Sequence, residues 1–311
     1  MSEKTKKKFT ELTDQLYQAM LSGPSKTLRN YAKAMRNLYT YYSFLNVLLI
    51  SLQKPDATIV MGYKRWQKFR RYVKKGERAI WIIAPIIKKI KHPTNEHPTD
   101  TLIVSEEERA DNNKPSRDQD KRNREDKVLV GFRFTWVFDI TQTEGEPFSD
   151  PLDQVGFTGL AMPVSLEKAI SRLRGAGIIV EIGEPALPGR GGYTDGRKIV
   201  LYQRKEAAML SVLLHELVHY KLHFDEQRNI RKDVSQQQRE LEAQYGSFLA
   251  GELLGLSSLE VSSDYLISYQ VNPNDLFRYL NRAGKAAMEI VEMLTGKSFG
   301  HKRWEIDKDK K

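Results

Sequence analysis

Five consecutive residues, His215-Glu216-Leu217-Val218-His219, combine the side chains that could bind one metal ion and activate one water molecule. On an α-helix, residues i and i+4 lie on the same face, about 6 Å apart, so both imidazoles can reach a single ion. Glu216 then points toward the water that this ion holds. The pattern is typical of the active-site helix of zinc peptidases. Because such short patterns also occur by chance, the interpretation depends on the flanking residues.

The flanking residues favour a partly buried helix. Residues 207–214 lead into the motif without Gly or Pro, and apolar side chains recur at three- and four-residue steps from Met209 to Val218. Polar groups buried without partners cost several kcal/mol, and a bound metal ion removes that cost. The alternative is an exposed amphipathic helix whose polar face contains the motif by accident.

A third protein ligand is expected, since a catalytic zinc ion holds three side chains and leaves one position to water. Glu240 begins the apolar-patterned part of the next helical stretch, residues 236–254, and Glu242 is its competitor. Two residues along a helix is a rotation of about 200°, so only one of them can face the metal. Ala243 and Gly246 lie on the same face as Glu240 and allow close helix packing, which favours Glu240. Asp225, Glu226 and Asp233 are more distant alternatives.

His223 continues the row of histidines, but it lies about 12 Å from His215 on a straight helix. Both cannot bind one ion whose bonds to nitrogen are near 2 Å. We expect His223 either beside the ligands or on the surface.

Composition bounds the class of protein. At 311 residues the chain is long enough for two domains, which we place at 1–150 and 151–311. It has no cysteine, which excludes disulfides and thiolate metal sites. Its N-terminal lysine run is followed by no apolar segment, and no apolar stretch reaches about 18 residues, so we expect a cytoplasmic protein rather than a secreted or membrane-spanning one.

The basic residues are concentrated in the first half. Of 50 Lys and Arg and 40 Asp and Glu, residues 1–150 hold 28 and 19, and residues 61–91 hold eleven basic residues with the single acid Glu77. Aromatic residues are interleaved there, which is typical of surfaces that bind single-stranded DNA or another nucleic acid. The candidates are Lys64, Arg65, Trp66, Lys68, Arg70, Arg71, Lys74 and Lys75. For a single aromatic such as Trp66, however, spacing with Phe69 and Val73 favours the buried face of a short helix.

The elements predicted around these residues are mixed. We expect helices at 9–22, 26–53, 64–73, 165–174, from 207 through the histidine motif, 236–254 and 273–295. Strands are expected at 58–61, 79–84, 128–138, 177–182 and 198–201, with 79–87 pairing with 128–138. Residues 92–127, rich in charge and Pro, predict a disordered insertion or hairpin tip, and 141–163 a linker. The fold class is therefore α+β, with N-terminal helices and a small antiparallel sheet before a helical domain with its own small sheet.

Several of these segments resemble a known family. Residues 38–63, 72–85 and 136–143 are similar to the N-terminal single-stranded-DNA-binding domain of ArdC-type antirestriction proteins. Gly192-Tyr193-Thr194-Asp195, 199–201, 215–219 and Glu240-Leu241-Glu242-Ala243 resemble their zincin-like domain, and more loosely ImmA/IrrE-type metallopeptidases. The resemblance covers about three quarters of the chain. It departs from the family at Gln244, where many relatives have an acid, and in the long insertion.

The resemblance implies a protein of a mobile genetic element that shields incoming single-stranded DNA, with Zn²⁺ held by His215, His219 and Glu240. Glu216 is then the general base of a metalloendopeptidase that acts on an unknown protein substrate, and Tyr193 is a candidate for stabilising the oxyanion. Two alternatives stay open: a DNA-binding protein whose zinc site is structural or vestigial, and a metallopeptidase that cleaves repressors.

Overall fold

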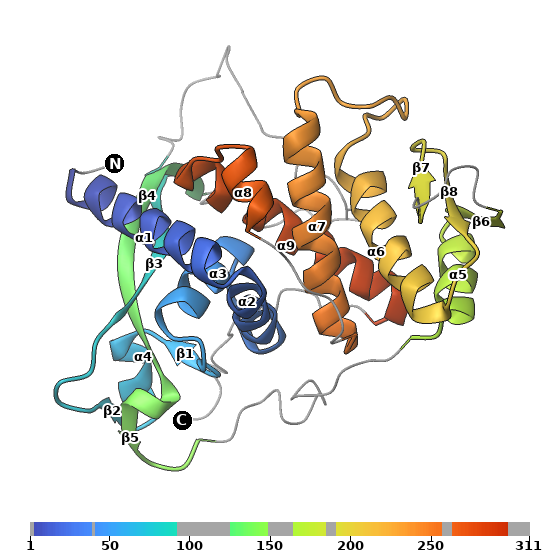
Figure 1. Ribbon diagram of the computed structural model, residues 1–311. Coiled ribbons are helices and arrows are strands. Elements are labelled where there is room, and N and C mark those ends of the chain that lie inside the picture. Colours follow the sequence, from blue (N-terminus) through green and yellow to red (C-terminus); the bar gives the residue numbers. More distant parts are fainter. Residues whose placement is uncertain are drawn as a thin grey trace, which may run out of the picture.

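The computed structural model describes residues 3–38, 41–91, 125–148, 164–184, 191–256 and 263–297. Helices and three small sheets make up an α+β fold, as the sequence predicted (Figure 1). The N-terminal elements are α1 (Glu3–Ser22), α2 (Pro24–Leu38), α3 (Phe44–Gln53), β1 (Val60–Met61), α4 (Tyr63–Lys68), β2 (Arg71–Val73), β3 (Ile80–Lys91), β4 (Glu125–Asp139) and β5 (Thr143–Gly145). The C-terminal elements are α5 (Leu166–Gly175), β6 (Ile179–Gly183), β7 (Gly192–Thr194), β8 (Lys198–Tyr202), α6 (Glu206–Leu222), α7 (Gln236–Leu254), α8 (Asp264–Ser268) and α9 (Pro273–Thr295).

The long C-terminal helices begin and end where local signals place them. The side chains of Ser235 and Asn272 accept backbone N–H groups in the first turns of α7 and α9. Gly255 and Gly296 follow these two helices with φ of 82° and 66°, the left-handed conformation that ends a helix at little cost for glycine. The predicted helices at 236–254 and 273–295 are therefore confirmed, and the helix expected at 165–174 is α5.

Two predicted N-terminal helices were wrong in extent. The helix expected at 26–53 is two helices, because α2 ends at Leu38 and the Ser43 side chain starts α3 by accepting the N–H of Asn46. The helix expected at 64–73 ends at Lys68. Arg70 has a φ of 55°, which reverses the chain, and residues 71–73 pair as β2 with β5. The apolar residues thus keep helical spacing beyond Lys68, although residues 71–73 form a strand.

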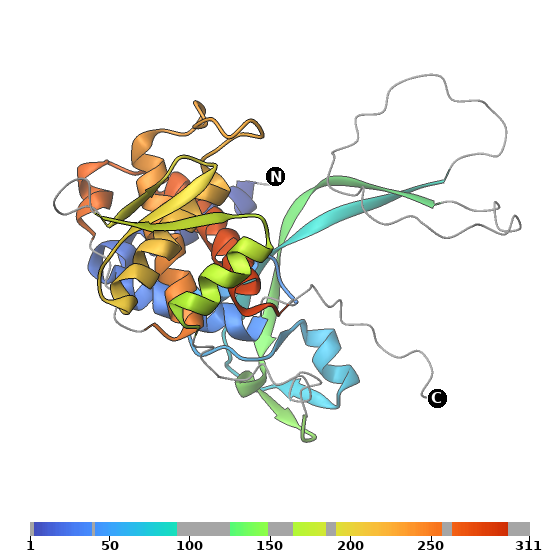
Figure 2. The same cartoon turned by 90° about the vertical axis from the view of Figure 1, so that its right-hand side faces the viewer.

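The β3–β4 hairpin is the longest sheet feature, and the predicted pairing of its strands is confirmed. Its register runs from Ile80 opposite Val137 to Lys91 opposite Glu125, and β1 adds to the other edge of β4. Residues 125–127 belong to β4 rather than to the predicted insertion, and residues 92–124 lie outside the described part of the chain. Figure 2 shows the outer half of the hairpin extending away from the helices.

Side-chain amides attach the edge strand β3 to α3. Asn46 donates to the carbonyl of Ile83 and accepts its N–H, both at 2.8 Å. Gln53, two helical turns later, donates to the carbonyl of Trp81 at 2.9 Å and accepts its N–H at 3.0 Å. Each amide satisfies the backbone N–H and C=O groups of β3 that a neighbouring strand would otherwise bind. The edge of the sheet is covered in this way, and the base of the hairpin is held against α3.

The C-terminal sheet is mixed. Strand β8 lies in the middle, with β6 parallel and β7 antiparallel to it. Helix α6 packs against β7 and β8 on one side and against α7 and α9 on the other, so it lies between the sheet and the helical core (Figure 1). This position buries one side of α6 from Met209 to Val218, the part that carries the histidine motif.

One hydrophobic core joins the two halves of the chain. It runs from Leu16 in α1 and Met35 in α2 through Leu280 in α9 to Leu213 in α6. Helix α9 approaches α2 so closely that a Cβ at Gly284 would lie 2.3 Å from the Tyr31 hydroxyl. The division at residues 150 and 151 stays a prediction, since residues 149–163 are not described. Among the described helices, none combines the length and apolar character needed to cross a bilayer.

Candidate functional site

Helices α6 and α7 bring together His215, His219 and Glu240, the three residues predicted to hold a metal ion. The close packing expected at Gly246 is present, because a Cβ there would lie 2.8 Å from Cγ2 of Val218 on α6. Glu240, one turn into α7, reaches the histidines because the two helices approach so closely.

The ligand atoms have the separations that one ion needs. Nε2 of His215 and Nε2 of His219 are 3.1 Å apart, and the two Glu240 carboxylate oxygens lie 3.6 and 3.8 Å from them. Zn–N and Zn–O bonds of 2.0–2.1 Å in a tetrahedron place ligand atoms about 3.3–3.4 Å apart. With one atom from each residue, the three potential ligand atoms lie within 4.8 Å of one another, so small side-chain movements would bring them around one divalent ion. Among the described residues no other group of His, Cys, Asp and Glu has such an arrangement.

The charge of the site also suits a cation. Hydrogen bonding to His215 and then to His219 lowers the pKa of Glu240 well below its usual range, so this carboxylate is ionised at neutral pH. An ionised carboxylate is the form that binds a metal ion.

Glu216 lies in the same cleft as the three ligands. The cleft has a volume of about 490 Å³, and its walls include α6, α7 and strand β7, from which Tyr193 contributes. Gly192 lets β7 approach α6, because a Cβ there would lie 2.5 Å from the carbonyl oxygen of Val200 and 2.9 Å from Val212. The arrangement can therefore place a carboxylate base and a substrate group beside a bound ion.

Behind the ligands, His223 and Glu242 form a buried pair. Nδ1 of His223 is 2.9 Å from Nδ1 of His219, and its Nε2 is 3.0 Å from Oε2 of Glu242. The other Glu242 oxygen accepts from Gln238 at 2.9 Å and from Arg282 at 3.2 Å. Burial lowers the pKa of His223, which keeps its imidazole neutral. His223 is thus beside the ligands rather than on the surface.

Glu242, the competitor for the third ligand position, points toward His223 and does not line the cleft. The more distant alternatives Asp225, Glu226 and Asp233 are exposed, and Asp233 pairs with Arg231. Spacing from His219 pointed to His223, one helical turn on, and the structure has it in the first of its two expected places, beside the ligands. Arg282 could not have been found in this way, because it comes from α9 and no local pattern connects it to α6 or α7.

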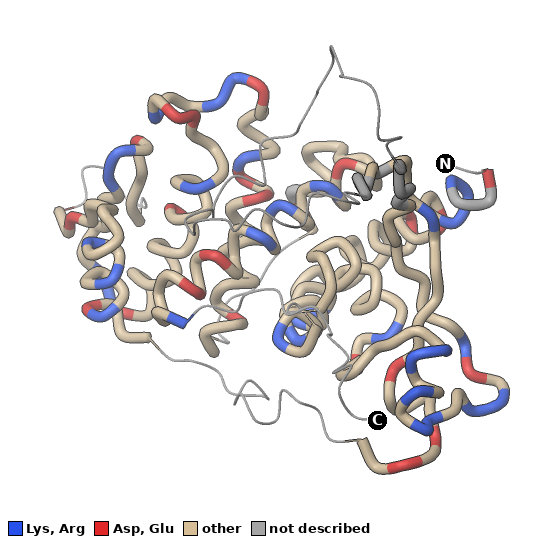
Figure 3. Tube along the Cα trace, turned by 180° about the vertical axis from the view of Figure 1, so that it is seen from behind, with Lys and Arg blue, Asp and Glu red and all other residues tan. Residues whose placement is uncertain are grey.

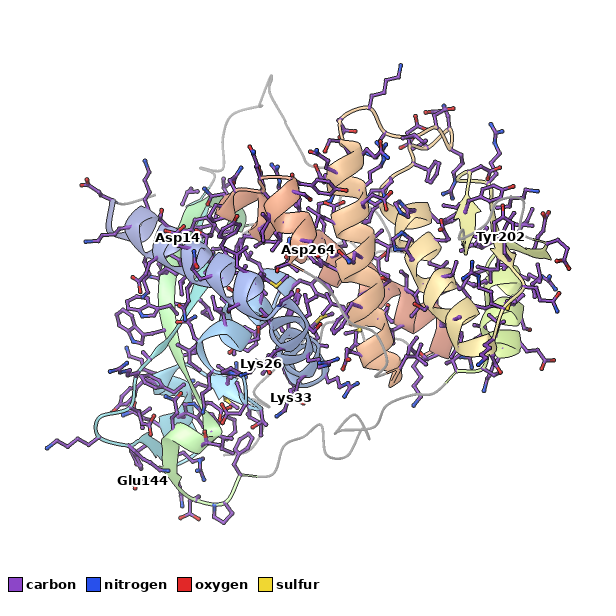
Figure 4. All side chains as sticks on the ribbon, in the orientation of Figure 1. Asp14, Lys26, Lys33, Glu144, Tyr202 and Asp264 are labelled. Carbon is purple, nitrogen blue, oxygen red and sulfur yellow. The ribbon has the colours of Figure 1, made fainter. Side chains whose placement is uncertain are left out.

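The predicted nucleic-acid residues gather at the other end of the molecule, on a lobe formed by α4, β2 and β5 (Figure 3). Lys64, Lys68, Arg70, Lys74 and Lys75 are exposed there. In Figure 4, Glu144 marks this lobe and Tyr202 marks the sheet beside α6, at opposite ends of the view.

Three of the predicted residues have structural contacts instead. Trp66 is fully buried and donates its indole N–H to the Phe138 carbonyl at 2.9 Å, so its predicted role in binding nucleic acid is wrong for this conformation. The alternative, a buried face of a short helix, describes it correctly. Arg71 donates to the Thr143 hydroxyl and carbonyl at 2.9 and 3.0 Å and holds β2 against β5. Arg65 is half-buried, and burial lowers the pKa of its guanidinium.

Comparisons with known proteins agree with this architecture. A family model described as the N-terminal domain of anti-restriction factor ArdC matches residues 6–138. An uncharacterized protein of Bacillus anthracis is 24% identical over 330 aligned positions, which cover 95% of this chain and 52% of that protein. The chain therefore spans about half the length of this curated relative.

Two solved structures are similar, both of the antirestriction ArdC protein from the R388 plasmid. The Mn(II)-bound structure has a TM-score of 0.56 at 17% identity, covering 93% of this chain and 98% of that one. The metal-free structure has a TM-score of 0.49 at 18% identity, covering 83% and 86%. Residues 6–138 are thus similar to the N-terminal domain of anti-restriction factor ArdC, and the likeness to the Mn(II)-bound ArdC structure shows that the chain shares its fold.

Proposed function

We propose that this chain is an antirestriction protein that binds single-stranded DNA through its N-terminal half and carries a zinc peptidase site in its C-terminal half. The observation that carries the proposal is the meeting of His215, His219 and Glu240 in one cleft with Glu216. Similarity to an Mn(II)-bound ArdC structure supports a divalent ion. Two imidazoles, one carboxylate and an open position favour Zn²⁺ as that ion.

The chemistry follows from these side chains. A zinc ion held by His215, His219 and Glu240 would supply Lewis acidity toward a peptide carbonyl and would lower the pKa of water toward about 7. Glu216 takes the proton of the attacking water and passes it to the leaving amine nitrogen. Tyr193 is a candidate donor to the oxygen of the attacked carbonyl. Strand β7 lies at the edge of its sheet and along the cleft, which suits a substrate peptide in an extended conformation.

A catalytic role is favoured over a structural one by the ligand set and the cleft. Structural zinc sites are usually closed by four protein ligands, whereas this one has three among the described residues and faces a cleft. The test compares Glu216→Ala and His215→Ala in cells whose incoming DNA is challenged by a restriction enzyme. A catalytic site predicts loss of protection in both variants. Full protection by Glu216→Ala together with an unfolded His215→Ala protein would establish a structural zinc.

The DNA-binding half of the proposal is supported by the family match and by the exposed cations of the N-terminal half. Phosphate contacts release counterions, and each contact contributes about 0.7 to the salt slope on a single strand. We expect labelled single-stranded DNA to bind the full chain with a steep salt dependence. Binding that is absent at low salt would contradict this part of the proposal.

A further inference from the structure

A second cleft lies at the base of the β3–β4 hairpin, away from the metal centre. Its volume is about 910 Å³, and it is enclosed by α1, the end of α3, the loop before β3 and the first residues of β3. Four basic side chains line it, against two acidic ones, Asp56 and Glu77. The basic residues are Lys8, Lys54, Lys75 and Arg78.

Two of these cations are available to a ligand. Lys8 pairs with Glu11 at 2.6 Å and Lys54 pairs with Asp56 at 3.1 Å. The side chains of Lys75 and Arg78 are exposed and make no ion pair or hydrogen bond with any residue that the structure describes. They leave an uncompensated positive charge at the cleft, which favours an anionic partner.

One ring of an aromatic pair lines the cleft, and the other stands beside it. Trp81 lines the cleft, and its ring packs edge-to-face against that of Trp136, with centroids 5.6 Å apart and an angle of 81°. Trp136 stands directly opposite Trp81 in the hairpin and is 54% exposed. Gln53 fixes the backbone of Trp81 through two hydrogen bonds, so the ring pair sits on a rigid support. Phe132, two pairs further out on the same face, is also exposed.

We propose that this cleft is where the chain holds single-stranded nucleic acid, with a base stacked on Trp136 and the neighbouring phosphates on Lys75 and Arg78. The proposal rests on the DNA-binding function proposed above and gives it a location. Unpaired bases present the flat face that an exposed indole can cover, whereas the bases of a duplex are already stacked. Cations beside a rigid ring pair match a polyanion with bases better than they match a protein partner.

The location differs from the one that the sequence suggested. Of the eight residues predicted from the basic stretch, only Lys75 lines the cleft. Lys64 and Lys68 are on α4 of the lobe and do not line it. Alternation of aromatic residues at 132, 134 and 136 was the available signal for the rings beside the cleft, since residues two apart on a strand share a face.

The experiment measures binding of a labelled dT oligomer, and of an abasic oligomer of the same length, to the full chain. Trp136→Ala should weaken dT binding by about 5- to 150-fold, the range for one stacked base, and leave abasic binding unchanged. Trp136→Phe should restore most of the dT affinity. Lys75→Glu with Arg78→Glu should weaken both oligomers and lower the salt slope. Lys64→Glu with Lys68→Glu, the same change of charge on the lobe, is the control and should have a smaller effect.

Each outcome decides between the proposals. If the unmodified chain binds no single-stranded DNA, the proposed DNA-binding function fails. If it binds and Trp136→Ala binds dT equally well, or if the lobe pair of variants has the larger effect, the cleft is overturned while DNA binding stands. Equal losses on dT and abasic oligomers for Trp136→Ala would also overturn the stacking role. Trp136 is 54% exposed but packs edge-to-face on Trp81, so Trp136→Ala should lower the melting temperature slightly, and its unchanged binding of the abasic oligomer shows that the variant is folded.

Discussion

Glu242 is linked to His219 through His223, although Glu242 itself does not line the cleft. The carboxylate binds His223 at 3.0 Å, and His223 meets the far nitrogen of His219 at 2.9 Å. Partners of this kind orient a metal-binding imidazole and fix its tautomer. The pair is fully buried, so no solvent competes for these contacts.

We predict that Glu242→Gln weakens Zn²⁺ binding by about 10- to 100-fold, because the partner of His223 loses its charge. A competition titration with a chromophoric chelator measures this. Glu289→Gln is the matched control, since Glu289 pairs with Lys221 near the surface at 2.8 Å and should leave the affinity unchanged. An unchanged affinity in Glu242→Gln would show that the buried pair does not position His219. The free energy of unfolding without metal separates this effect from general destabilisation.

The site residues that lie on one helix could be predicted from the sequence alone. His215, Glu216 and His219 need only a helical turn to come together. The choice between Glu240 and Glu242 depends on how α7 is rotated about its axis, which packing against α9 and the contact with Arg282 fix. Trp66 was misassigned because its burial depends on β4, about 70 residues later in the chain.

At the scale of elements, the distance between α6 and α7 sets the metal site. Gly246 allows that distance, since a Cβ at this position would meet the stiff side chain of Val218 at 2.8 Å. An added methyl group there separates the helices and moves Glu240 away from both histidines.

We therefore predict that Gly246→Ala lowers the free energy of unfolding by about 1–3 kcal/mol, the usual cost of overpacking, and also weakens Zn²⁺ binding. Chemical denaturation and the chelator competition measure the two effects. Gly175→Ala is the control, because no atom lies within 4 Å of its added Cβ, and it should be neutral or slightly stabilising. A Gly246→Ala protein as stable as this control would contradict the packing argument.

Elements with strong caps were predicted with accurate ends, and elements without them were not. Ser235, Asn272 and the glycines after α7 and α9 are local signals that the sequence displays. The break between α2 and α3 contains neither Pro nor Gly. The end of α4 depends on β5, which pairs with residues 71–73 from a distant part of the chain. Long-range pairing of this kind leaves no trace in local spacing.

At the scale of the whole molecule, one continuous core extends from the helices that carry the proposed metal site into the N-terminal half. Leu280 and Gly284 of α9 contact the core that α1 and α2 also enter, and α9 packs along α6 and α7. Chain length favoured two domains, and the predicted linker at 141–163 together with the change in charge placed their boundary near residue 150. Composition reports on surfaces, so it could not reveal that the interiors are continuous.

We predict a single thermal transition for the full chain, with Zn²⁺ raising its midpoint when tryptophan fluorescence is the probe. The described tryptophans Trp66, Trp81 and Trp136 are all in the N-terminal half, and a Trp304→Phe background removes the remaining one. Metal at about 100 times its dissociation constant stabilises the folded state by about 2.7 kcal/mol. The halves would unfold independently if two transitions were seen. In that case Zn²⁺ would shift a transition that is detected by circular dichroism but not by tryptophan fluorescence.

The most direct test of the account is the number of zinc ions that the purified chain binds, measured by isothermal titration with His219→Ala beside it. The account predicts one tightly bound ion per chain, retained in Glu216→Gln because Glu216 is not a ligand, and lost in His219→Ala. A chain that binds no zinc stoichiometrically, or a His219→Ala protein that binds it as tightly as the unmodified chain, would contradict the metal centre on which the proposed function depends.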